Sequence, residues 1–592
     1  MDKEWNLTHI YPTQEDFEKD LDYAQKVILP GIASLEGKLS EESQLRKYFA
    51  FQRKATEVFN HLARFASRRS DLDKKNVKNL ADEAKVENLF HDFGSADSYS
   101  TPEILSLGKE KRDNFFEKHP EYKDFDFQVD KIFRGEKFTL PARQERLLSY
   151  YAPLEGRGAN LYSQLSVGDY TPKKVTLSNG KEVEVNRSNW TSLESSLENQ
   201  EDREKVFLSL YSWYNEHKNT YGEIYNSVVQ GELSERKARG YSSILQEHLY
   251  HNKIDESVFH NLVEAANENA EPLHKYYEIR RKHFGLEHHR SYDRFLSLAK
   301  SEKKYTYEEA KSIFFDSIKD YPSDYQKKAH EVLEEGYVDV YPRSGKRTGG
   351  YSSGSANVHP YILLNFNGDL EDVFTLAHEA GHSVHTRYSE EAQPIVKQDY
   401  TIFVAEIAST FNEHNLLDYF RKNGTLSKND KIALLQKSID EIVSTFYRQT
   451  LFAQYEYEIS QKAEKGEPIN YQLLSDERTK LYKAYYGIDI TKEELKPLVW
   501  AYIPHLFYTP FYVYQYATSF TASRLIYQNF RSGKEDAFEN YLKRLKSGNS
   551  RYPIDEVKLA GVDLTKKEAF RAVTGRRKEL VDELESLLEE EK

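Results

Sequence analysis

The 592-residue sequence contains no cysteine. Disulfides, a thiol nucleophile and thiolate metal ligands are therefore excluded, and a bound metal ion must be held by histidine and carboxylate side chains. A chain without cysteine also fits a reducing compartment. The sequence starts with charged residues and no apolar run follows, so no secretion signal is visible and we expect a cytoplasmic protein.

Long apolar runs are also missing. No stretch approaches the roughly 20 apolar residues that cross a bilayer, so no membrane partner is expected. The 96 acidic residues outnumber the 83 Lys and Arg residues, which gives a net charge of −13. Because nucleic acids and anionic membranes are repelled by such a surface, no nucleic acid partner is expected either.

Glycine and proline are scarce, with 27 and 17 residues in the whole chain, which favours long helices over many short strands. Apolar residues recur at three- and four-residue spacing, as in Leu262, Ala266 and Leu273, and this period is typical of amphipathic helices. The 32 Phe and 44 Tyr residues supply ample apolar area for a core. The sequence therefore predicts a mainly α fold, in two or more packed subdomains because of its length.

Two segments break the helical pattern. Residues 174–177 and 182–185 flank an Asn179-Gly180 turn and predict a β-hairpin. A Gly/Ser-rich loop at 345–354 leads into the apolar run 358–366, which has the character of a buried strand or a sheet edge. We therefore expect a helical N-terminal domain over residues 1–200, closed by the hairpin, and a larger helical domain over 201–592 that carries the chemistry.

The segment after residue 366 predicts a helix with metal-binding side chains. A turn at 367–369 carries capping residues, and acidic side chains follow in the first turn of the helix. His378 and His382 are four residues apart, so their imidazoles project from one face about one turn apart and can occupy two corners of a tetrahedral zinc site. Glu379 follows the first histidine, near enough to reach a metal-bound water without binding the metal.

An ordinary amphipathic helix with two surface histidines is the alternative. Two observations argue against it. The histidines are surrounded by apolar residues, and buried polar groups need partners. Gly381 also costs stability inside a helix, which indicates close approach by another backbone or a ligand.

A catalytic zinc needs a third protein ligand and one open position. Glu406 lies among apolar residues in a second helical stretch, an expensive place for a carboxylate unless a cation compensates it. Glu413 lies two turns further on the same face and is the candidate for orienting a ligand histidine; either glutamate could instead lie at a solvated helix edge. His385 also projects to the metal face, about 10.5 Å along an ideal helix axis from His378, so we expect it to support the ligands or to contact substrate.

Motifs along nearly the whole chain resemble oligoendopeptidase F, within the thimet-oligopeptidase-like zinc metallopeptidases. They are residues 5–11 (WNLTHIY), 236–241 (RKARGY), the HEAGH helix followed by FVAE at 403–406, residues 444–450 (STFYRQT), and the segment 505–516. The resemblance implies a multi-helix ellipsoid with a deep central active-site cleft. It also implies that His378, His382 and Glu406 bind zinc, one ion per chain, and that Glu379 is the general base or acid.

A tyrosine-rich segment follows the zinc motifs. The family places a histidine and tyrosines here, and His505 matches that histidine. Oxyanion stabilisation during attack on a peptide carbonyl needs such donors. We favour Tyr512 as the phenol, with Tyr514 next and aromatic core packing as the alternative. Residues 358–366 are expected to accept substrate as an added strand, with Gly349 and Gly350 as a flexible wall.

These expectations combine into a zinc-dependent endopeptidase that hydrolyses internal bonds of short unstructured peptides. Zinc lowers the pKa of its bound water, Glu379 removes a proton from that water, and the resulting nucleophile attacks the peptide carbonyl. A zinc carboxypeptidase of related helical fold is the closest alternative, which a cationic grip on a terminal carboxylate would favour. A non-catalytic peptide-binding protein is a third reading, against which the complete set of metal-site residues argues.

Overall fold

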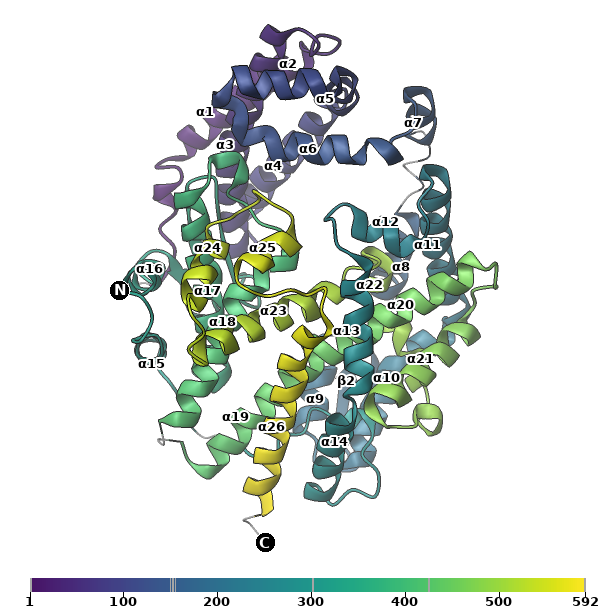
Figure 1. Ribbon diagram of the computed structural model, residues 1–592. Coiled ribbons are helices and arrows are strands. Elements are labelled where there is room, and N and C mark those ends of the chain that lie inside the picture. Colours follow the sequence, from purple (N-terminus) through teal and green to yellow (C-terminus); the bar gives the residue numbers. More distant parts are fainter. Residues whose placement is uncertain are drawn as a thin grey trace. The chain divides into compact units, whose positions relative to one another are not determined.

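The computed structural model describes residues 3–149, 151, 154, 156–300, 303–423 and 426–589. Most of these residues are helical, and their strands form two small sheets (Figure 1). The mainly α prediction is therefore confirmed. Among the described residues, no helix has the length and apolar character needed to cross a membrane.

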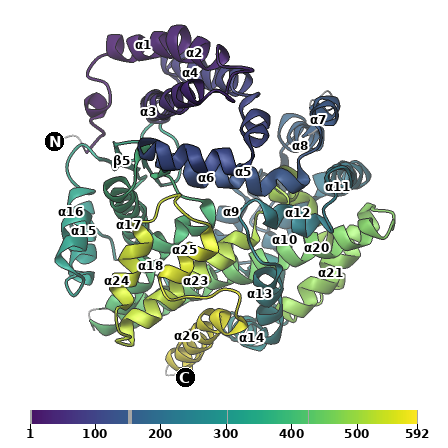
Figure 2. The same ribbon diagram turned by 45° about the horizontal axis from the view of Figure 1, so that its top comes forward.

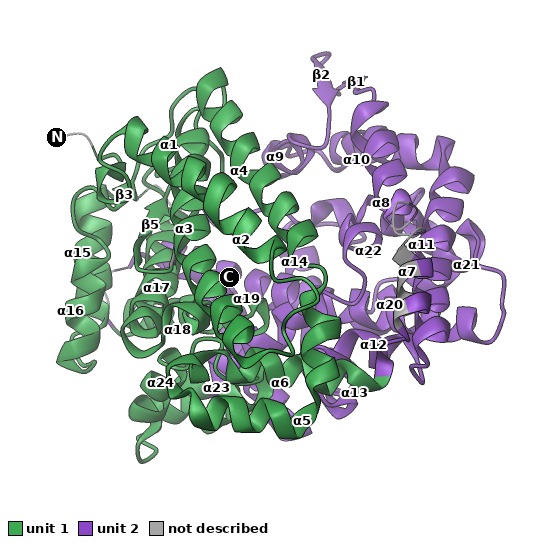
Figure 3. Cartoon of the chain, turned by 90° about the horizontal axis from the view of Figure 1, so that it is seen from above, with its two compact units in different colours: residues 1–137, 303–422, 526–562 green, residues 138–302, 423–525, 563–592 purple. Residues whose placement is uncertain are grey.

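The chain divides into two compact units, each built from three separate segments (Figure 3). Unit 1 contains residues 1–137, 303–422 and 526–562, and unit 2 contains residues 138–302, 423–525 and 563–592. The prediction divides the chain once, near residue 200, whereas each of these units contains three separate segments. The two divisions are of different kinds, so the predicted boundary stays a prediction. The ellipsoidal outline and central cleft that the resemblance implies also stay predictions.

Unit 1 carries the metal-site residues. Its helices and strands are η1 (Leu7–His9), α1 (Gln14–Tyr23), η2 (Ala24–Ile28), α2 (Leu29–Ala33), α3 (Glu42–Leu72), α4 (Val77–Ala96), α5 (Ser100–Lys118), η3 (Pro120–Phe125), α6 (Asp126–Gly135), α15 (Tyr307–Ser317), α16 (Ser323–Glu331), β3 (Val338–Asp339), β4 (Tyr351–Ser355), β5 (Val358–Leu363), α17 (Leu370–Ala392), η8 (Ile395–Lys397), α18 (Ile402–Lys422), α24 (Ala537–Leu545) and α25 (Pro553–Leu559).

Unit 2 carries the tyrosine-rich segment. Its elements are α7 (Ala142–Ser149), α8 (Arg157–Ser163), η6 (Gln164–Gly168), β1 (Lys173–Thr176), β2 (Glu182–Val185), α9 (Trp190–Ser196), α10 (Gln200–Glu216), α11 (Lys218–Arg239), α12 (Ile244–Tyr250), α13 (Glu256–Glu268), α14 (Glu271–His283), η7 (Ser291–Asp293), α19 (Lys428–Ile442), η9 (Val443–Tyr447), α20 (Arg448–Glu464), α21 (Tyr471–Tyr486), η10 (Ile490–Lys492), η11 (Lys496–Tyr502), α22 (His505–Tyr508), η12 (Lys567–Phe570) and α26 (Arg571–Glu589). Two further elements cross the division, η4 (Glu136–Phe138) and α23 (Tyr514–Arg531).

Two apolar clusters hold the N-terminal helices of unit 1 together. The long helix α3 packs along α4 (Figure 2), and its apolar side chains contribute to both clusters. Phe17 and Leu62 are fully buried in one cluster, and Phe49 is buried in the other against Phe125, with ring centroids 4.8 Å apart. These buried aromatic contacts explain how a chain so rich in Phe and Tyr forms a helical core.

The predicted strand at 358–366 is confirmed as β5, but it is the central strand of a three-stranded sheet in the order β3-β5-β4. It pairs in parallel with β3 and antiparallel with β4. An incoming peptide cannot add to β5 where both of its edges are already paired, so the expectation of strand addition at 358–366 is wrong. Among the described residues, β3 and β4 are the two edge strands of this sheet, and β4 starts directly after Gly350.

The β-hairpin is also confirmed. Strands β1 and β2 pair antiparallel, with Lys174 opposite Glu184 and Thr176 opposite Glu182. Gly180 has a φ of 81°, the left-handed conformation that an Asn-Gly hairpin turn requires.

Candidate metal centre

Helix α17 presents both histidines from one face, as the spacing predicts. Its first turn is stabilised by the side chain of Asp372, which accepts a 3.0 Å hydrogen bond from the backbone amide of Asp369. The apolar residues around the histidines, such as Leu376 and Ala377, are fully buried and fix the rotation of the helix. His378 and His382 consequently face the same side, one turn apart.

A close helix crossing brings the third ligand to this face. Helix α18 packs against α17, and a Cβ built on Gly381 would lie 2.5 Å from the carbonyl oxygen of Ala408. The close approach that a mid-helix glycine indicated is therefore confirmed, and its partner is the backbone of α18. Asn412 of α18 donates a 3.1 Å hydrogen bond to the carbonyl of Ala377, which fixes the register of the two helices at the crossing.

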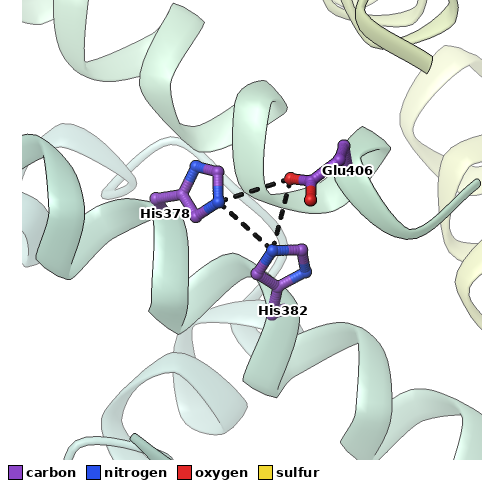
Figure 4. Close-up of side chains that lie close together, drawn as sticks. All are labelled: His378, His382 and Glu406. Carbon is purple, nitrogen blue, oxygen red and sulfur yellow. Dashed lines mark hydrogen bonds and ion pairs between the residues drawn. The ribbon is translucent and has the colours of Figure 1, made fainter. Parts of the chain in front are cut away.

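Three ligand atoms form a nearly equilateral triangle between α17 and α18 (Figure 4). Nε2 of His378 lies 3.2 Å from Nε2 of His382, and Oε2 of Glu406 lies 3.3 Å and 3.4 Å from these two nitrogens. Zinc bonds of about 2.0–2.1 Å at the tetrahedral angle place neighbouring ligand atoms about 3.3 Å apart. The three side chains thus fit three corners of a tetrahedral zinc site.

The fourth corner can be reached from outside. The side chains of His378, His382 and Glu406 keep 25%, 16% and 27% of their exposure. Structural zinc sites use four protein ligands, whereas a catalytic site keeps one position for water or substrate. Three partly exposed ligands in this geometry are typical of the catalytic kind.

Glu413 supports the first histidine from behind. Its carboxylate bonds Nδ1 of His378, so that Nε2 of the same ring points to the metal position. The contact predicted from the seven-residue spacing of Glu406 and Glu413 is confirmed. Ser409 donates a 2.9 Å hydrogen bond to Oε2 of Glu406 and holds that ligand in the same way.

The electrostatics of the site call for a cation. Burial lowers the pKa of His378, but the carboxylates of Glu413 and Glu406 outweigh burial and raise this pKa well above its usual value. Burial likewise raises the pKa of Glu406, but His382 and His378 outweigh it and hold this pKa well below its usual range. With the imidazoles neutral, as metal ligands must be, the carboxylates would remain uncompensated, and a divalent cation compensates them.

Glu379 lies on the same helix, directly after the ligand histidine His378. Its side chain is buried, and Oε2 has no hydrogen-bond partner among the described residues. Burial raises the pKa of Glu379 above its ordinary value, although His378 and His382 oppose the shift. A Cβ built on Gly350 would lie 3.5 Å from Oε1 of Glu379, so the glycine leaves room beside this carboxylate.

The glycine loop is anchored before the glycine pair and at its first glycine. The fully buried amino group of Lys346 lies 2.5 Å from Oδ1 of Asp339 and donates a 2.8 Å hydrogen bond to the carbonyl of Tyr341. Asn365 donates a 2.7 Å hydrogen bond to the carbonyl of Gly349. The role of Lys346 was missed because a lysine in a Gly/Ser-rich loop reads as solvent-exposed.

His385 is fully buried and stacks on Tyr400, with ring centroids 3.7 Å apart. Both ring nitrogens lack hydrogen-bond partners among the described residues, and burial lowers its pKa well below the usual value. The sequence left two roles open for His385, support of the metal helix and contact with substrate. Because its ring has no exposed surface, the supporting role is favoured.

In unit 2, three rings of the tyrosine-rich segment form a group. The ring of His505 lies parallel to that of Tyr512 with centroids 6.2 Å apart, and Tyr516 packs edge-on against both, at 6.3 Å and 5.5 Å. All three are partly exposed, and burial lowers the pKa of His505. Tyr514 is instead buried, with its ring 5.8 Å from that of Phe259. The alternative of aromatic packing therefore fits Tyr514 better than Tyr512.

Comparison with protein families gives two matches. The profile of peptidase family M3 matches residues 194–575, and a profile described as Oligopeptidase F matches residues 103–171. Oligopeptidase PepF of Bacillus subtilis is 34% identical over 586 residues, which cover 99% of this chain and 87% of that protein. An oligoendopeptidase F homolog of Borreliella burgdorferi is also 34% identical, over 95% of this chain and 94% of that one.

Two solved structures share the fold over nearly their whole length. A peptidase from Chlamydophila abortus superposes with a TM-score of 0.89 at 32% identity, covering 99% of this chain and 98% of its own. Oligoendopeptidase-F from Enterococcus faecium superposes with a TM-score of 0.77 at 27% identity, covering 98% and 99%.

Proposed function

The chain belongs to peptidase family M3, and from this premise we propose a zinc-dependent endopeptidase of the oligoendopeptidase F type that hydrolyses internal bonds of short unstructured peptides. The observation that carries the proposal is the triangle of His378, His382 and Glu406, whose edges of 3.2–3.4 Å match a tetrahedral zinc site with one position left for catalysis.

One zinc ion per chain would be held by these three side chains. When bound, it supplies Lewis acidity, which polarises a peptide carbonyl and acidifies water. Glu413 keeps His378 in the tautomer whose Nε2 is free to bind, through its contact with Nδ1. The thiol-free donor set of two imidazoles and one carboxylate is one that catalytic zinc uses.

Glu379 is the proposed general base. Its carboxylate would take a proton from the attacking water and later deliver it to the leaving amine. Its burial supports this role, because a carboxyl group with a raised pKa binds a proton more readily than an exposed one. Gly350, next to its Oε1, has no side chain that could cover this carboxylate.

His505 and Tyr512 are the proposed donors to the oxyanion that forms on the carbonyl. Their parallel rings and partial exposure support the pair, and Tyr516 joins the same group as the next candidate. Burial lowers the pKa of His505, so its ring is neutral near pH 7 and carries one N–H to donate.

The substrate backbone is assigned to the edge strand β4 rather than to β5. This edge starts at Tyr351, directly after Gly349 and Gly350, and Gly350 lies beside Glu379. A peptide that adds to β4 as a further strand would be bound through its main chain, which suits substrates of varied sequence. A folded protein offers no such extended segment without local unfolding.

The decisive experiment digests a peptide blocked at both ends and reads the products by mass. Internal cleavage that disappears on chelation and returns with one equivalent of zinc supports the proposal. Cleavage restricted to peptides with a free C-terminal carboxylate would favour the carboxypeptidase alternative. Binding of the blocked peptide without any cleavage by the zinc-loaded protein would favour the non-catalytic alternative.

A further inference from the structure

Unit 2 buries a group of cations that the proposed reaction does not use. Arg448 opens helix α20, Arg478 lies in α21, Lys496 opens η11, and Arg294 follows η7. Within the described part of the chain, none of these four side chains has a carboxylate oxygen at ion-pair distance. Such charges are expensive to bury without a counter-charge.

Shared aromatic rings connect three of these cations, Arg448, Arg478 and Lys496. The guanidinium carbons of Arg448 and Arg478 lie 5.0 Å and 5.4 Å from the ring centre of Phe452. Arg478 and the amino group of Lys496 lie 4.6 Å and 5.1 Å from the ring centre of Tyr482. Cation–π contacts of this kind recover part of the lost hydration but do not neutralise charge.

Arg478, the most buried of the four, has hydrogen-bond donors without acceptors in the described part of the chain. Arg478 is 1% exposed, and its Nε and Nη1 have no hydrogen-bond partner among the described residues. Lys496 is 2% exposed, whereas Arg448 and Arg294 keep partial exposure. The group thus combines buried donors that lack acceptors within the described chain with two cations that keep contact with solvent.

Neighbouring acids do not balance the group. Glu493 accepts a 2.6 Å hydrogen bond from Ser291 through Oε2, and its Oε1 has no partner among the described residues. Glu194 is fully buried, neither of its oxygens has such a partner, and burial raises its pKa to about 8, which leaves it mostly protonated at neutral pH. The carboxylates that act on the group, Glu493 on Lys496 and Asp440 on Arg294, are therefore fewer than its four cations.

Burial and repulsion between the cations both lower pKa values in the group. Burial, aided by Arg448, lowers the pKa of Arg478 to about 10. Burial and the neighbouring Arg294 lower the pKa of Lys496 well below its usual value. Even with Lys496 neutral, three guanidinium groups remain charged, because arginine keeps its proton at any physiological pH.

We propose that Arg448, Arg478, Lys496 and Arg294 form a buried binding site for a small monovalent anion, a halide or a carboxylate. Guanidinium groups donate several hydrogen bonds in a plane and suit both kinds of anion. Bound there, the anion would accept the free donors of Arg478 and reduce the repulsion between the cations.

The site is linked by the chain to the proposed oxyanion donors. Lys496 is preceded by Leu495, a non-glycine residue held at a left-handed φ of 62°, and η11 then runs to Tyr502, close before His505. An anion that fixes Lys496 would stabilise this strained start of η11. We therefore expect the anion to raise kcat as well. This consequence rests on the proposed function, whereas the existence of the site does not.

The test measures the thermal unfolding midpoint of the full zinc-loaded chain at constant ionic strength. Sodium HEPES, whose anion is bulky, is replaced stepwise by sodium chloride or by sodium acetate. We expect a saturable rise on the order of 3 °C with at least one of the two small anions. The variant Arg448→Met, which removes a side chain without a hydrogen bond to the rest of the described chain, should lose this rise.

Lys480→Met is the matched control, because Lys480 lies in the same helix as Arg478 but is exposed and paired with Glu458. This variant should keep the saturable rise. Crystals soaked in bromide should show an anomalous peak among the four cations, a readout that needs no variant. Equal midpoints in all three salts, an unchanged rise in Arg448→Met, or the absence of the peak would each overturn the site. A thermal response without any change in kcat would keep the site and overturn its coupling to His505.

Discussion

The backbone amide of Phe511 donates a 2.8 Å hydrogen bond to Oε1 of Glu456, a buried residue of α20. Phe511 is not a glycine, yet its φ is 54°, in the left-handed region that costs a bulky residue about 1–3 kcal/mol. The bond to Glu456 therefore holds a strained residue directly before Tyr512. It links a buried carboxyl group to the orientation of the proposed oxyanion donor.

Replacing Glu456 tests this link. Glu456→Leu leaves the amide of Phe511 without its acceptor, so we expect Tyr512 to lose its fixed position and kcat to fall on the order of 10-fold. Glu456→Gln keeps an acceptor oxygen of the same reach and should retain most of kcat. Steady-state kinetics on a blocked peptide, with zinc content measured in parallel, checks both. Equal loss in the two variants would show that the charge or fit of Glu456 matters rather than this bond.

The same carboxyl group predicts a pH dependence of stability. Burial raises the pKa of Glu456 from 4.5 to about 8. The folded protein therefore retains this proton above pH 4.5, where the unfolded chain releases it. The resulting stability is full below pH 4.5 and is lost as the pH rises towards 8, with a slope of up to about 1.4 kcal/mol per pH unit.

Denaturant unfolding of the wild type and of Glu456→Gln between pH 5 and 8 measures this contribution. Because glutamine does not titrate, the free energy of unfolding of the variant should fall less steeply with pH than that of the wild type. Parallel curves over the whole range would mean that Glu456 titrates normally in the folded protein.

Glu413 should set the affinity for zinc without binding the ion. Its carboxylate fixes the ring of His378 through Nδ1, and loss of such a support typically weakens metal binding about 10- to 100-fold. We expect this loss in Glu413→Ala, measured by competition with a chromogenic chelator. Glu334→Ala, an exposed glutamate of the same unit, is the control and should bind zinc as the wild type does. Wild-type affinity in Glu413→Ala would remove the supporting role.

Glu379→Gln separates the base from the ligands. The amide keeps the size of the side chain but cannot accept a proton at neutral pH, so turnover should fall by at least about 100-fold while one zinc per chain remains bound. His382→Ala removes a ligand instead and should lose zinc and activity together. Elemental analysis alongside kcat distinguishes the two variants. A near-normal kcat in Glu379→Gln would exclude this residue as the base.

The metal centre could be predicted because its signals are local. His378 and His382 lie one turn apart, and Glu406 and Glu413 two turns apart, so helical periodicity alone puts each pair on one face. A carboxylate among apolar residues also indicates that a cation compensates its charge. Glu406 is such a carboxylate, and it lies opposite the two imidazoles. Sequence spacing thus predicts which functional side chains lie together wherever one helix carries both of them.

Features built by contacts distant in the sequence could not be predicted in this way. The apolar pattern of β5 describes burial equally well at the centre and at the edge of a sheet, so its position between β3 and β4 was not visible. Glu456 and Phe511 are 55 positions apart, and no period connects them. Gly381 indicated that another group approaches the helix closely. The identity of that group, the backbone of α18, depends on how the two helices cross and could not be predicted.

That crossing gives the last prediction. A methyl group at position 381 would lie 2.5 Å from the carbonyl oxygen of Ala408 and 2.8 Å from the Cα of Ser409, both rigid backbone atoms. Gly381→Ala must therefore push α18 away from α17, with an expected loss of about 2–3 kcal/mol in unfolding free energy. Because Glu406 lies on α18 and both histidines on α17, the same displacement should open the ligand triangle and weaken zinc binding.

Gly231 in α11 is the matched control, since a Cβ there meets nothing within 4 Å. Gly231→Ala should instead stabilise the protein by about 0.5–1 kcal/mol, through the better helix propensity of alanine, and leave the affinity for zinc unchanged. Unfolding by denaturant and zinc competition on both variants decide the matter: a Gly381→Ala protein as stable and as tight for zinc as Gly231→Ala would show that the two helices can separate without disturbing the site.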